Sequence, residues 1–223
     1  MVFKNEWERI YRNNLQLSRW PWSSLVSLVN RHCDIREGMK VLELGCGAGA
    51  NIPFFVSLKS DYHAIEVSQT TVASLKSEYR DNASVDVKQG DFTDDISIFG
   101  PNFDLIFDRG ALTLNSTEGI ERVLKQVYKT LKPGGIYIGV DWLSTSHSAR
   151  KQDKAERIGD NTYIFSTGYF KDIGQVHFFA ENDLRELFAE YEFIYLVEKL
   201  NDIKIPIPQQ YNLWDFVVRK HAE

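Results

Sequence analysis

The feature that most constrains the fold of this chain is the segment VLELGCGAG, residues 41–49, in which an apolar run ends in three alternating glycines. The apolar part is typical of a strand buried on both faces of a parallel sheet. Glycine allows positive φ and has no Cβ to keep a ligand away from the backbone. The helix that follows would point its first amides at that ligand. The segment therefore predicts an α/β fold with a ligand site against bare main chain.

From residue 40 onward, short apolar runs alternate with helical segments, which is typical of strand–helix–strand units and a parallel sheet. The predicted strands are residues 40–44, 62–67, 84–89, 103–108, 136–142, 192–200 and 211–219. We expect Ser68 to cap a helix after the second strand. Further helices are predicted over residues 117–131 and 181–191, and Asn182 or a residue nearby is the expected cap of the second of these. The last two strands are expected to form a hairpin at the sheet edge.

Two segments fall outside this alternation. Residues 1–36 precede the first strand, and residues 143–177 are too many for an ordinary connection. Long excursions at the carboxyl ends of strands are where α/β folds build lids and substrate pockets. We therefore expect a single domain, 1–223, with an N-terminal helical lid (1–36) and an insertion (143–177) that covers the acceptor site. The mixed charges between Arg150 and Asp160 predict a solvated helix in that insertion.

The composition is that of an ordinary globular chain, with 43% hydrophobic and 26% charged residues. The formal net charge is -5, and no lysine- or arginine-rich stripe occurs, which argues against an extended nucleic-acid interface. The first residues lack a signal-peptide core and no apolar run is long enough to span a bilayer, so we expect a cytoplasmic protein without a membrane span. Cys33 and Cys46 alone make neither a disulfide framework nor a zinc site, and the histidines lack ligand spacing, so we expect no metal.

The glycine pattern by itself is compatible with two cofactors. GCGAGA, residues 45–50, formally matches the nicotinamide dinucleotide fingerprint, and a turn that only packs a helix on a strand is the plain alternative. Glu66 ends the second strand, where its carboxylate can accept hydrogen bonds from the ribose of either cofactor. Glu43 and Asp91 favour S-adenosylmethionine. Glu43 offers negative charge to an ammonium group, and Asp91, followed by Phe92, can accept a hydrogen bond from an adenine amino group.

Five motifs carry a resemblance to a known family: VLELGCGAG, AIEVS, QGDF, FDLIFDRGAL and LKPGGIYIGV. They come in the order and spacing of class I S-adenosylmethionine-dependent methyltransferases of the small-molecule type, and the likeness covers residues 38–142. The resemblance implies a Rossmann-like α/β fold with helices on both faces of a seven-stranded sheet. The implied strand order is 3-2-1-4-5-7-6, with strand 7 antiparallel.

The resemblance also implies a cofactor site for S-adenosylmethionine and its product S-adenosylhomocysteine. The residues assigned to it are Glu43, Gly45, Cys46, Gly47, Gly49, Glu66, Val67, Asp91, Phe92 and Asp108. Glu43 and the three glycines flank the methionine part, and Glu66 holds the ribose. Asp91 and Phe92 hold the adenine, with Val67 against its other face. Asp108 ends the fourth strand beside the methyl group.

Several of these assignments have alternatives. Glu43 can instead cap the following turn, and Asp91 can be a loop acid or a helix N-cap. Cys46 has no cation beside it in the sequence, so we expect a small residue tolerated in a tight turn and not a reactive thiol. An NAD(P)-dependent oxidoreductase and a non-catalytic binding module with the same fold also stay open.

The expected reaction is an in-line displacement, because a sulfonium donor is already activated. The protein then has to align the reacting atoms and exclude water. A general base is needed only if the acceptor must lose a proton. Asp108 and His147 are the candidate catalytic residues, while His177 is expected to pack at a helix entry. The Asp108–Arg109 pair resembles a segment of thiopurine methyltransferases, without implying their thiol substrate, and it can equally be a salt-bridged turn.

We expect the methyl acceptor to be a small molecule. The predicted substrate-binding residues are Trp20, Trp22, Arg109, Trp142, His147 and Tyr169. Trp7 and Tyr11 are expected instead to fasten the N-terminal helices to the sheet. RNA methylation is disfavoured by the net charge and by the sequence DRGA, which stands where many amino-group nucleic-acid methylases have Asn/Asp-Pro-Pro-aromatic. The sequence leaves the methylated atom and the oligomeric state open.

Overall fold

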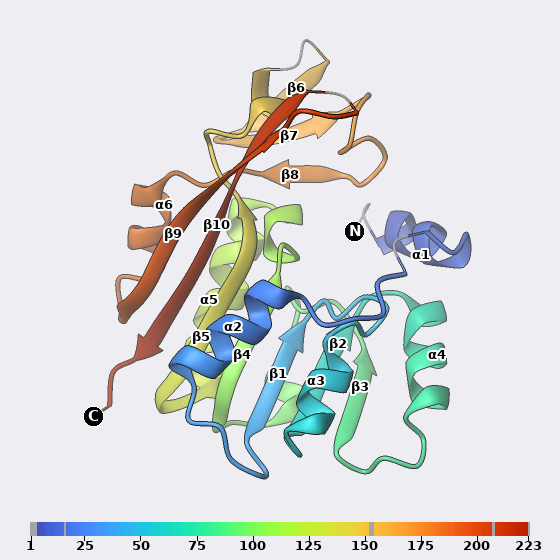
Figure 1. The fold of residues 1–223 in the computed structure, drawn as a ribbon, viewed down its shortest axis with the longest axis vertical. Helices are drawn as coiled ribbons and strands as arrows, with labels where there is room; N and C mark the ends of the chain where they lie inside the picture. The colour runs from blue at the N-terminus through green and yellow to red at the C-terminus, as the bar shows by residue number, and fades with distance from the viewer. Residues whose placement is uncertain (1–3, 16, 152–153, 207, 223) are drawn as a thin grey trace.

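A seven-stranded sheet forms the centre of the computed structural model, which describes residues 4–15, 17–151, 154–206 and 208–222 (Figure 1). In spatial order its strands are β3 (Val85–Gln89), β2 (Asp61–Glu66), β1 (Lys40–Leu44), β4 (Phe103–Arg109), β5 (Leu131–Leu143), β10 (Gln209–Lys220) and β9 (Tyr191–Ile203). Strands β1 to β5 pair in parallel, whereas β10 pairs antiparallel with both β5 and β9. The predicted fold class, strand order, antiparallel strand and edge hairpin are therefore confirmed.

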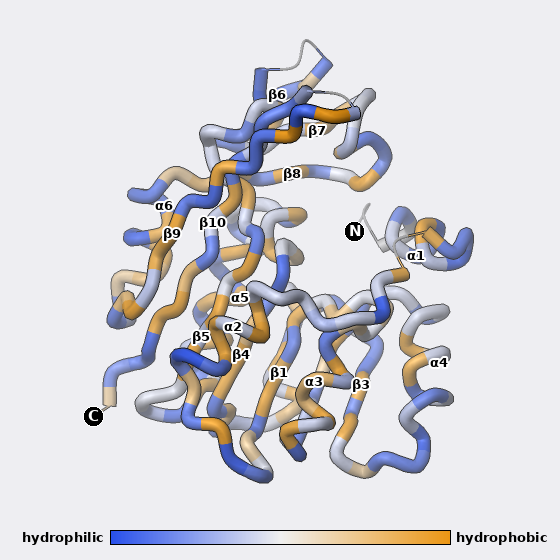
Figure 2. Tube along the Cα trace, viewed as in Figure 1, coloured by the Kyte–Doolittle hydropathy of each residue, from blue (hydrophilic) through white to orange (hydrophobic). Residues whose placement is uncertain are grey.

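Helices cover both faces of this sheet. The helices that cover it are α2 (Ser23–His32), α3 (Ile52–Ser57), α4 (Gln69–Glu78), α5 (Thr117–Thr130) and α6 (Glu181–Leu187). The helix α1 (Lys4–Arg12) lies apart from them, and the 3-10 turns are η1 (Ser97–Phe99), η2 (Leu112–Leu114) and η3 (Ser148–Lys151). One buried cluster joins α2, α3 and α4 to one face, and a second joins α5 and α6 to the other. Figure 2 shows hydrophobic residues along β1 and β4, in the middle of the sheet. Burial on both faces explains why their apolar runs are nearly continuous.

The helix ends follow local hydrogen-bonding rules, with one correction. Ser68 caps α4 as predicted, since its side chain accepts a hydrogen bond from the Thr71 amide. At α6 the N-cap position is Ala180 and not Asn182, because the Asp183 carboxylate accepts from the Ala180 amide at 2.8 Å. The acid three residues into the helix thus satisfies the end that the sequence pattern assigned to an asparagine.

The insertion after β5 folds as a second, three-stranded antiparallel sheet. Its strands, in spatial order, are β6 (Ala155–Gly159), β7 (Thr162–Phe165) and β8 (Gln175–His177). The predicted solvated helix is wrong: Arg157 lies in β6 opposite Tyr163 of β7. The β-branched and aromatic residues of β7 provide a pairing edge, and that tertiary contact overrides the local charge pattern.

The two N-terminal helices have different surroundings. The α2 residues Leu25, Leu28 and Val29 are buried in the core cluster of the main sheet, so α2 is not part of a lid. In contrast, Ile10 of α1 is buried in a separate cluster with residues of the insertion, and Trp7 packs against that cluster. The lid stays a prediction, and of the two helices only α1 is placed apart from the core of the main sheet. Within the described residues, no helix is long and apolar enough to cross a membrane.

Gly139 offers a test of the core. A Cβ on this β5 residue would lie 2.3 Å from ring atoms of the fully buried Phe216, which is itself wedged against Trp142 and Phe188. We predict that Gly139→Ala lowers the free energy of unfolding by about 1–3 kcal/mol through overpacking. Denaturant unfolding should show this loss. Gly159→Ala is the control, because its Cβ would meet nothing closer than 3.7 Å; equal losses in both variants would contradict the packing account.

Candidate active site

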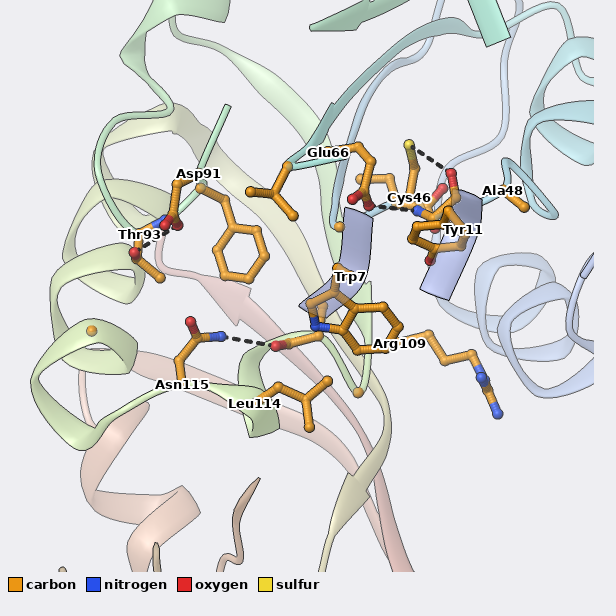
Figure 3. Close-up of a pocket in the computed structure, with 18 of the residues that line it drawn as sticks. Trp7, Tyr11, Cys46, Ala48, Glu66, Asp91, Thr93, Arg109, Leu114 and Asn115 are labelled. Carbon is orange, nitrogen blue, oxygen red and sulfur yellow. Dashed lines mark hydrogen bonds between the residues drawn. The ribbon is translucent and has the colours of Figure 1, made fainter. Parts of the chain in front are cut away.

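A cavity of about 600 Å³ lies at the carboxyl ends of β1, β2 and β4. This is the size range of small-ligand and cofactor sites. Of the residues predicted to bind the cofactor, the cavity lining includes Glu43, Gly45, Cys46, Gly47, Glu66, Val67, Asp91 and Phe92. Figure 3 shows Asp91 at the left of the cavity, Glu66 nearer its upper middle, and Trp7 below Glu66.

The glycine loop presents bare main chain to this cavity. Gly45 and Gly47 have φ of +71° and +53°, a region that side chains rarely adopt. A Cβ on Gly45 would lie 2.8 Å from the Ala111 Cβ, and one on Gly47 would lie 2.5 Å from the Tyr11 hydroxyl. Gly49 is outside the cavity lining, and a Cβ there would meet Leu75 at 2.5 Å. The first two glycines thus keep the cavity open, while the third allows close helix packing.

Glu66 is held rigidly at the tip of β2. Its carboxylate accepts hydrogen bonds from the Gly47 and Ser68 amides, each at 2.9 Å, and the residue is buried. Burial raises the pKa of Glu66, and these amide donors oppose that change. A carboxylate can accept about four hydrogen bonds, so Glu66 can also accept from a ligand hydroxyl.

Glu43 is a buried carboxylate in the cavity wall with no cationic partner among the described residues. Asn51 donates to it at 2.8 Å, and Tyr62 donates to its other oxygen. It does not cap the glycine turn, which was the alternative. Burial raises the pKa of Glu43 to about 7, although the two hydrogen bonds act in the opposite direction. Such a group is suited to a cationic ligand, which would supply the missing positive charge.

Asp91 and Phe92 follow β3. One Asp91 oxygen accepts from the Thr93 amide at 2.9 Å and from the Thr93 hydroxyl at 2.7 Å, which fixes the carboxylate in an Asx turn at the cavity wall (Figure 3). Ring atoms of Phe92 approach the Gly45 position. An acid and an aromatic ring therefore stand together in the cavity wall, with the ring beside Gly45.

Trp7 and Tyr11 enter the cavity from α1, which corrects their predicted role as simple fasteners (Figure 3). Their ring centroids are 5.8 Å apart. Burial, with a further contribution from Glu66, raises the pKa of Tyr11, so the phenol stays neutral. The sequence does contain a signal for this pair, namely two aromatic residues four apart on a short helix. It contains no signal for which surface they face.

Two of the predicted acceptor residues also line the cavity. The Arg109 guanidinium lies 3.4 Å above the centroid of the Trp22 ring, and Arg109 Nε donates to Asp141 at 2.8 Å. The predicted salt-bridged turn with Asp108 is therefore wrong, because Asp141 is the acid that pairs with Arg109. Stacking and ion pairing both hold this guanidinium in place, and it forms part of the cavity wall.

The other predicted acceptor residues lie elsewhere. Trp20 is 79% exposed and Tyr169 is 81% exposed, and neither lines the cavity. Trp142 is fully buried in the core. His147 packs among Phe170, Phe178 and Tyr211, and burial lowers its pKa to about 4. These four residues were assigned from their positions in loops or beside strands, which does not fix the direction of a side chain.

Asp108 is a buried residue that holds neighbouring segments together, and it does not line the cavity. It is fully buried and accepts hydrogen bonds from Tyr137 at 2.7 Å, Trp142 at 2.8 Å and the Leu112 amide at 3.1 Å. Burial raises the pKa of Asp108 to about 6. Its donors come from β5 and from the turn after β4, so it ties that turn to the sheet. This geometry argues against the predicted roles as base and as cofactor ligand.

Comparison with known proteins identifies the family. Residues 41–135 match the family model described as a methyltransferase domain. Residues 41–135 are thus a methyltransferase domain, and the chain has the class I fold of S-adenosylmethionine-dependent methyltransferases. This match favours the methyltransferase over the nicotinamide-dependent alternative that the glycine pattern left open.

Three similar proteins illustrate the range of acceptors. The mouse (Mus musculus) tRNA N(3)-cytidine methyltransferase METTL6 is 27% identical over 221 residues, covering 91% of this chain and 77% of the relative. A solved methyltransferase of Methanosarcina mazei has a TM-score of 0.70 at 15% identity, covering 92% of this chain and 100% of that one. The 1,6-didemethyltoxoflavin-N1-methyltransferase of Burkholderia thailandensis, solved with S-adenosylhomocysteine, has a TM-score of 0.69 at 15% identity, covering 99% and 88%. The two structural matches establish the fold.

The buried Glu43 gives a stability prediction for this methyltransferase. Its pKa is about 7 in the folded protein and is near 4.5 in the unfolded chain, so the folded state binds the extra proton between these values. Stability therefore falls as the pH rises from 4.5 to 7 and stays low above 7. We predict that Glu43→Gln raises the melting temperature at pH 8 by at least about 2–4 °C, the shift that about 1 kcal/mol gives at this size.

At pH 5, where Glu43 is protonated in the folded protein, the same substitution should change the melting temperature little. Differential scanning calorimetry at both values tests the assignment. A gain of equal size at pH 5 would show that ionisation of Glu43 is not its cause.

Proposed function

We propose that this methyltransferase transfers a methyl group from S-adenosylmethionine to a planar, nitrogen-containing small molecule held beneath α1. The observation that carries the proposal is the entry of Trp7 and Tyr11 into the same cavity as Glu43 and the glycine loop. Aromatic faces bind planar rings by stacking. The bound donor supplies an activated methyl group, so alignment and exclusion of water are the tasks left to the chain.

The proposed cofactor contacts follow from the chemistry of the lining. Glu43 pairs with the ammonium group, which supplies the charge that its burial lacks. Gly45 and Gly47 let the methionine part lie against main chain. Glu66 accepts from the ribose hydroxyls, and Asp91 accepts from the adenine amino group.

The position of both predicted bases outside the described lining of the cavity favours a nitrogen acceptor. Asp108 and His147, the predicted bases, lie outside the lining, and Tyr11 is held neutral. A ring nitrogen attacks through its lone pair and needs no proton removal beforehand, unlike a hydroxyl group. Tyr11 can still orient such a ring by a hydrogen bond, and the Arg109–Trp22 stack closes the side of the site.

A base in tRNA is the second candidate acceptor. It is favoured by the similarity to the tRNA N(3)-cytidine methyltransferase, which extends over 91% of this chain. Both candidates share the chemistry of a planar ring with a nucleophilic nitrogen. The net charge of -5 favours the small molecule, because tRNA binding depends on neutralising phosphates.

We predict that binding of S-adenosylhomocysteine depends on the ionisation of Glu43. Affinity measured by isothermal titration calorimetry should be about tenfold lower at pH 6 than at pH 8, because the ammonium group prefers the ionised carboxylate, whose pKa is about 7. Glu43→Gln should weaken binding and remove this pH dependence. Asp91→Ala is the matched control: it should weaken binding and leave the pH dependence in place. A wild-type affinity that is flat from pH 6 to 8 would disprove the ammonium contact.

The acceptor class is tested with methyl-labelled S-adenosylmethionine and two fractions of a cell extract, low-molecular-mass metabolites and total tRNA. We predict label in the metabolite fraction and none in tRNA. Trp7→Ala should lower that transfer about tenfold, the factor that 1.4 kcal/mol of lost stacking gives, and should retain S-adenosylhomocysteine binding. Label in tRNA alone would establish the second candidate in place of the first.

A further inference from the structure

We propose that Glu8 is a positioning residue that latches α1 over the cavity and thereby sets Trp7 and Tyr11 above the reacting atoms. The inference rests on the proposed function, since it gives Trp7 and Tyr11 a role at the acceptor. Glu8 itself lines no part of the cavity and acts only through its neighbours on the helix.

The latch consists of hydrogen bonds between α1 and the start of α4. The Ser68 hydroxyl donates to one Glu8 oxygen at 2.6 Å, and the Thr70 amide donates to the same oxygen at 3.2 Å. The Thr70 hydroxyl donates to the other oxygen. A carboxylate at the N-terminus of a helix is also stabilised by the helix dipole. Figure 1 shows α1 above this end of α4.

The same residues connect the latch to the cofactor side. Ser68 donates its hydroxyl to Glu8 and its amide to Glu66, so one residue joins α1 to the acid proposed to hold the ribose. Trp7 precedes Glu8 directly, and Tyr11 follows one turn later with its hydroxyl over Gly47. Fixing Glu8 therefore fixes the height of both rings above the glycine loop.

The opposite side of α1 is held by apolar contacts. Ile10 is buried with Phe165, Phe170 and other residues of the insertion, and Trp7 packs on this cluster. The helix thus bridges the cavity from the insertion to α4. Among the described residues, the hydrogen bonds of Glu8 hold the α4 side, and this side can release while the apolar side stays attached. In this arrangement α1 stays attached to the insertion, and the hydrogen bonds of Glu8 to α4 decide whether the helix covers the cavity.

The latch does not respond to pH near neutrality. Hydrogen bonds from Ser68 and then Thr70 lower the pKa of Glu8 to about 2, so the carboxylate stays ionised across the working range. Arg12 also pairs with Glu8 at 3.1 Å, but its side chain is 73% exposed. An exposed pair of this kind contributes little, so the bonds to α4 carry the latch.

The test measures release of S-adenosylhomocysteine by stopped-flow fluorescence, with Trp7 as a reporter inside the cavity. Glu8→Ala should speed dissociation at least about tenfold and lower kcat by a similar factor. Glu8→Gln, which keeps an acceptor oxygen, should restore part of both. Arg12→Ala is the matched control on the same helix and should stay within about twofold of wild type. Unchanged dissociation in Glu8→Ala would overturn the proposal.

A double-mutant cycle with Thr70→Val separates a latch from general loss of structure. Thr70 is exposed, so its substitution spares the core and remains informative if Glu8→Ala fails to fold. Thr70→Val alone should speed dissociation, and it should add little in the presence of Glu8→Ala, because both remove the same contact. Fully additive effects would overturn the proposal. Release of S-adenosylhomocysteine requires no acceptor. The dissociation rates therefore test the role of Glu8 even if the acceptor is not a small molecule.

Discussion

The arrangement of the site depends on one constraint, which is that carboxylates are buried beside bare main chain at one edge of a parallel sheet. Parallel strands bring their carboxyl ends to the same edge of the sheet. The acids at the ends of β1 and β2 and directly after β3 therefore converge as a consequence of the strand order alone. Glu66 accepts hydrogen bonds from backbone amides and Glu43 from the Asn51 and Tyr62 side chains, and all of these donors are neutral. The chain thus carries an electrostatic cost that a cationic ligand removes, and this links stability to binding.

The second consequence of this edge is that it needs a cover. A site at the end of a sheet is open to water, and in-line displacement proceeds best when water is excluded. Here the cover is assembled from two distant parts of the chain, because α1 rests on the insertion through Ile10 and on α4 through Glu8. Neither part encloses the cavity alone: among the described residues the insertion contributes only Gln175 to its lining.

How far the sequence predicts this molecule follows from the range of the interactions involved. The glycine loop and the acids at the strand tips were predictable, because each depends on a few neighbouring residues and on the strand order. Trp7 was missed because the surface that a short amphipathic helix faces is set by its partner, which is more than a hundred residues away. His147 and Tyr169 were misplaced for the same reason, since loop position does not determine where a side chain points.

Asp108 shows how a residue can lie at the right strand end and still serve another purpose. Its strand ends beside the cavity, but Tyr137 and Trp142 of β5 donate hydrogen bonds to its carboxylate within the core. The third donor, the Leu112 amide, belongs to the turn whose Ala111 packs 2.8 Å from the Gly45 Cβ position. By fixing that turn, the buried acid determines how closely a side chain can approach the glycine loop. The carboxylate therefore influences the shape of the cavity without lining it. Its position at the end of the strand led to the prediction that it contacts the reacting atoms.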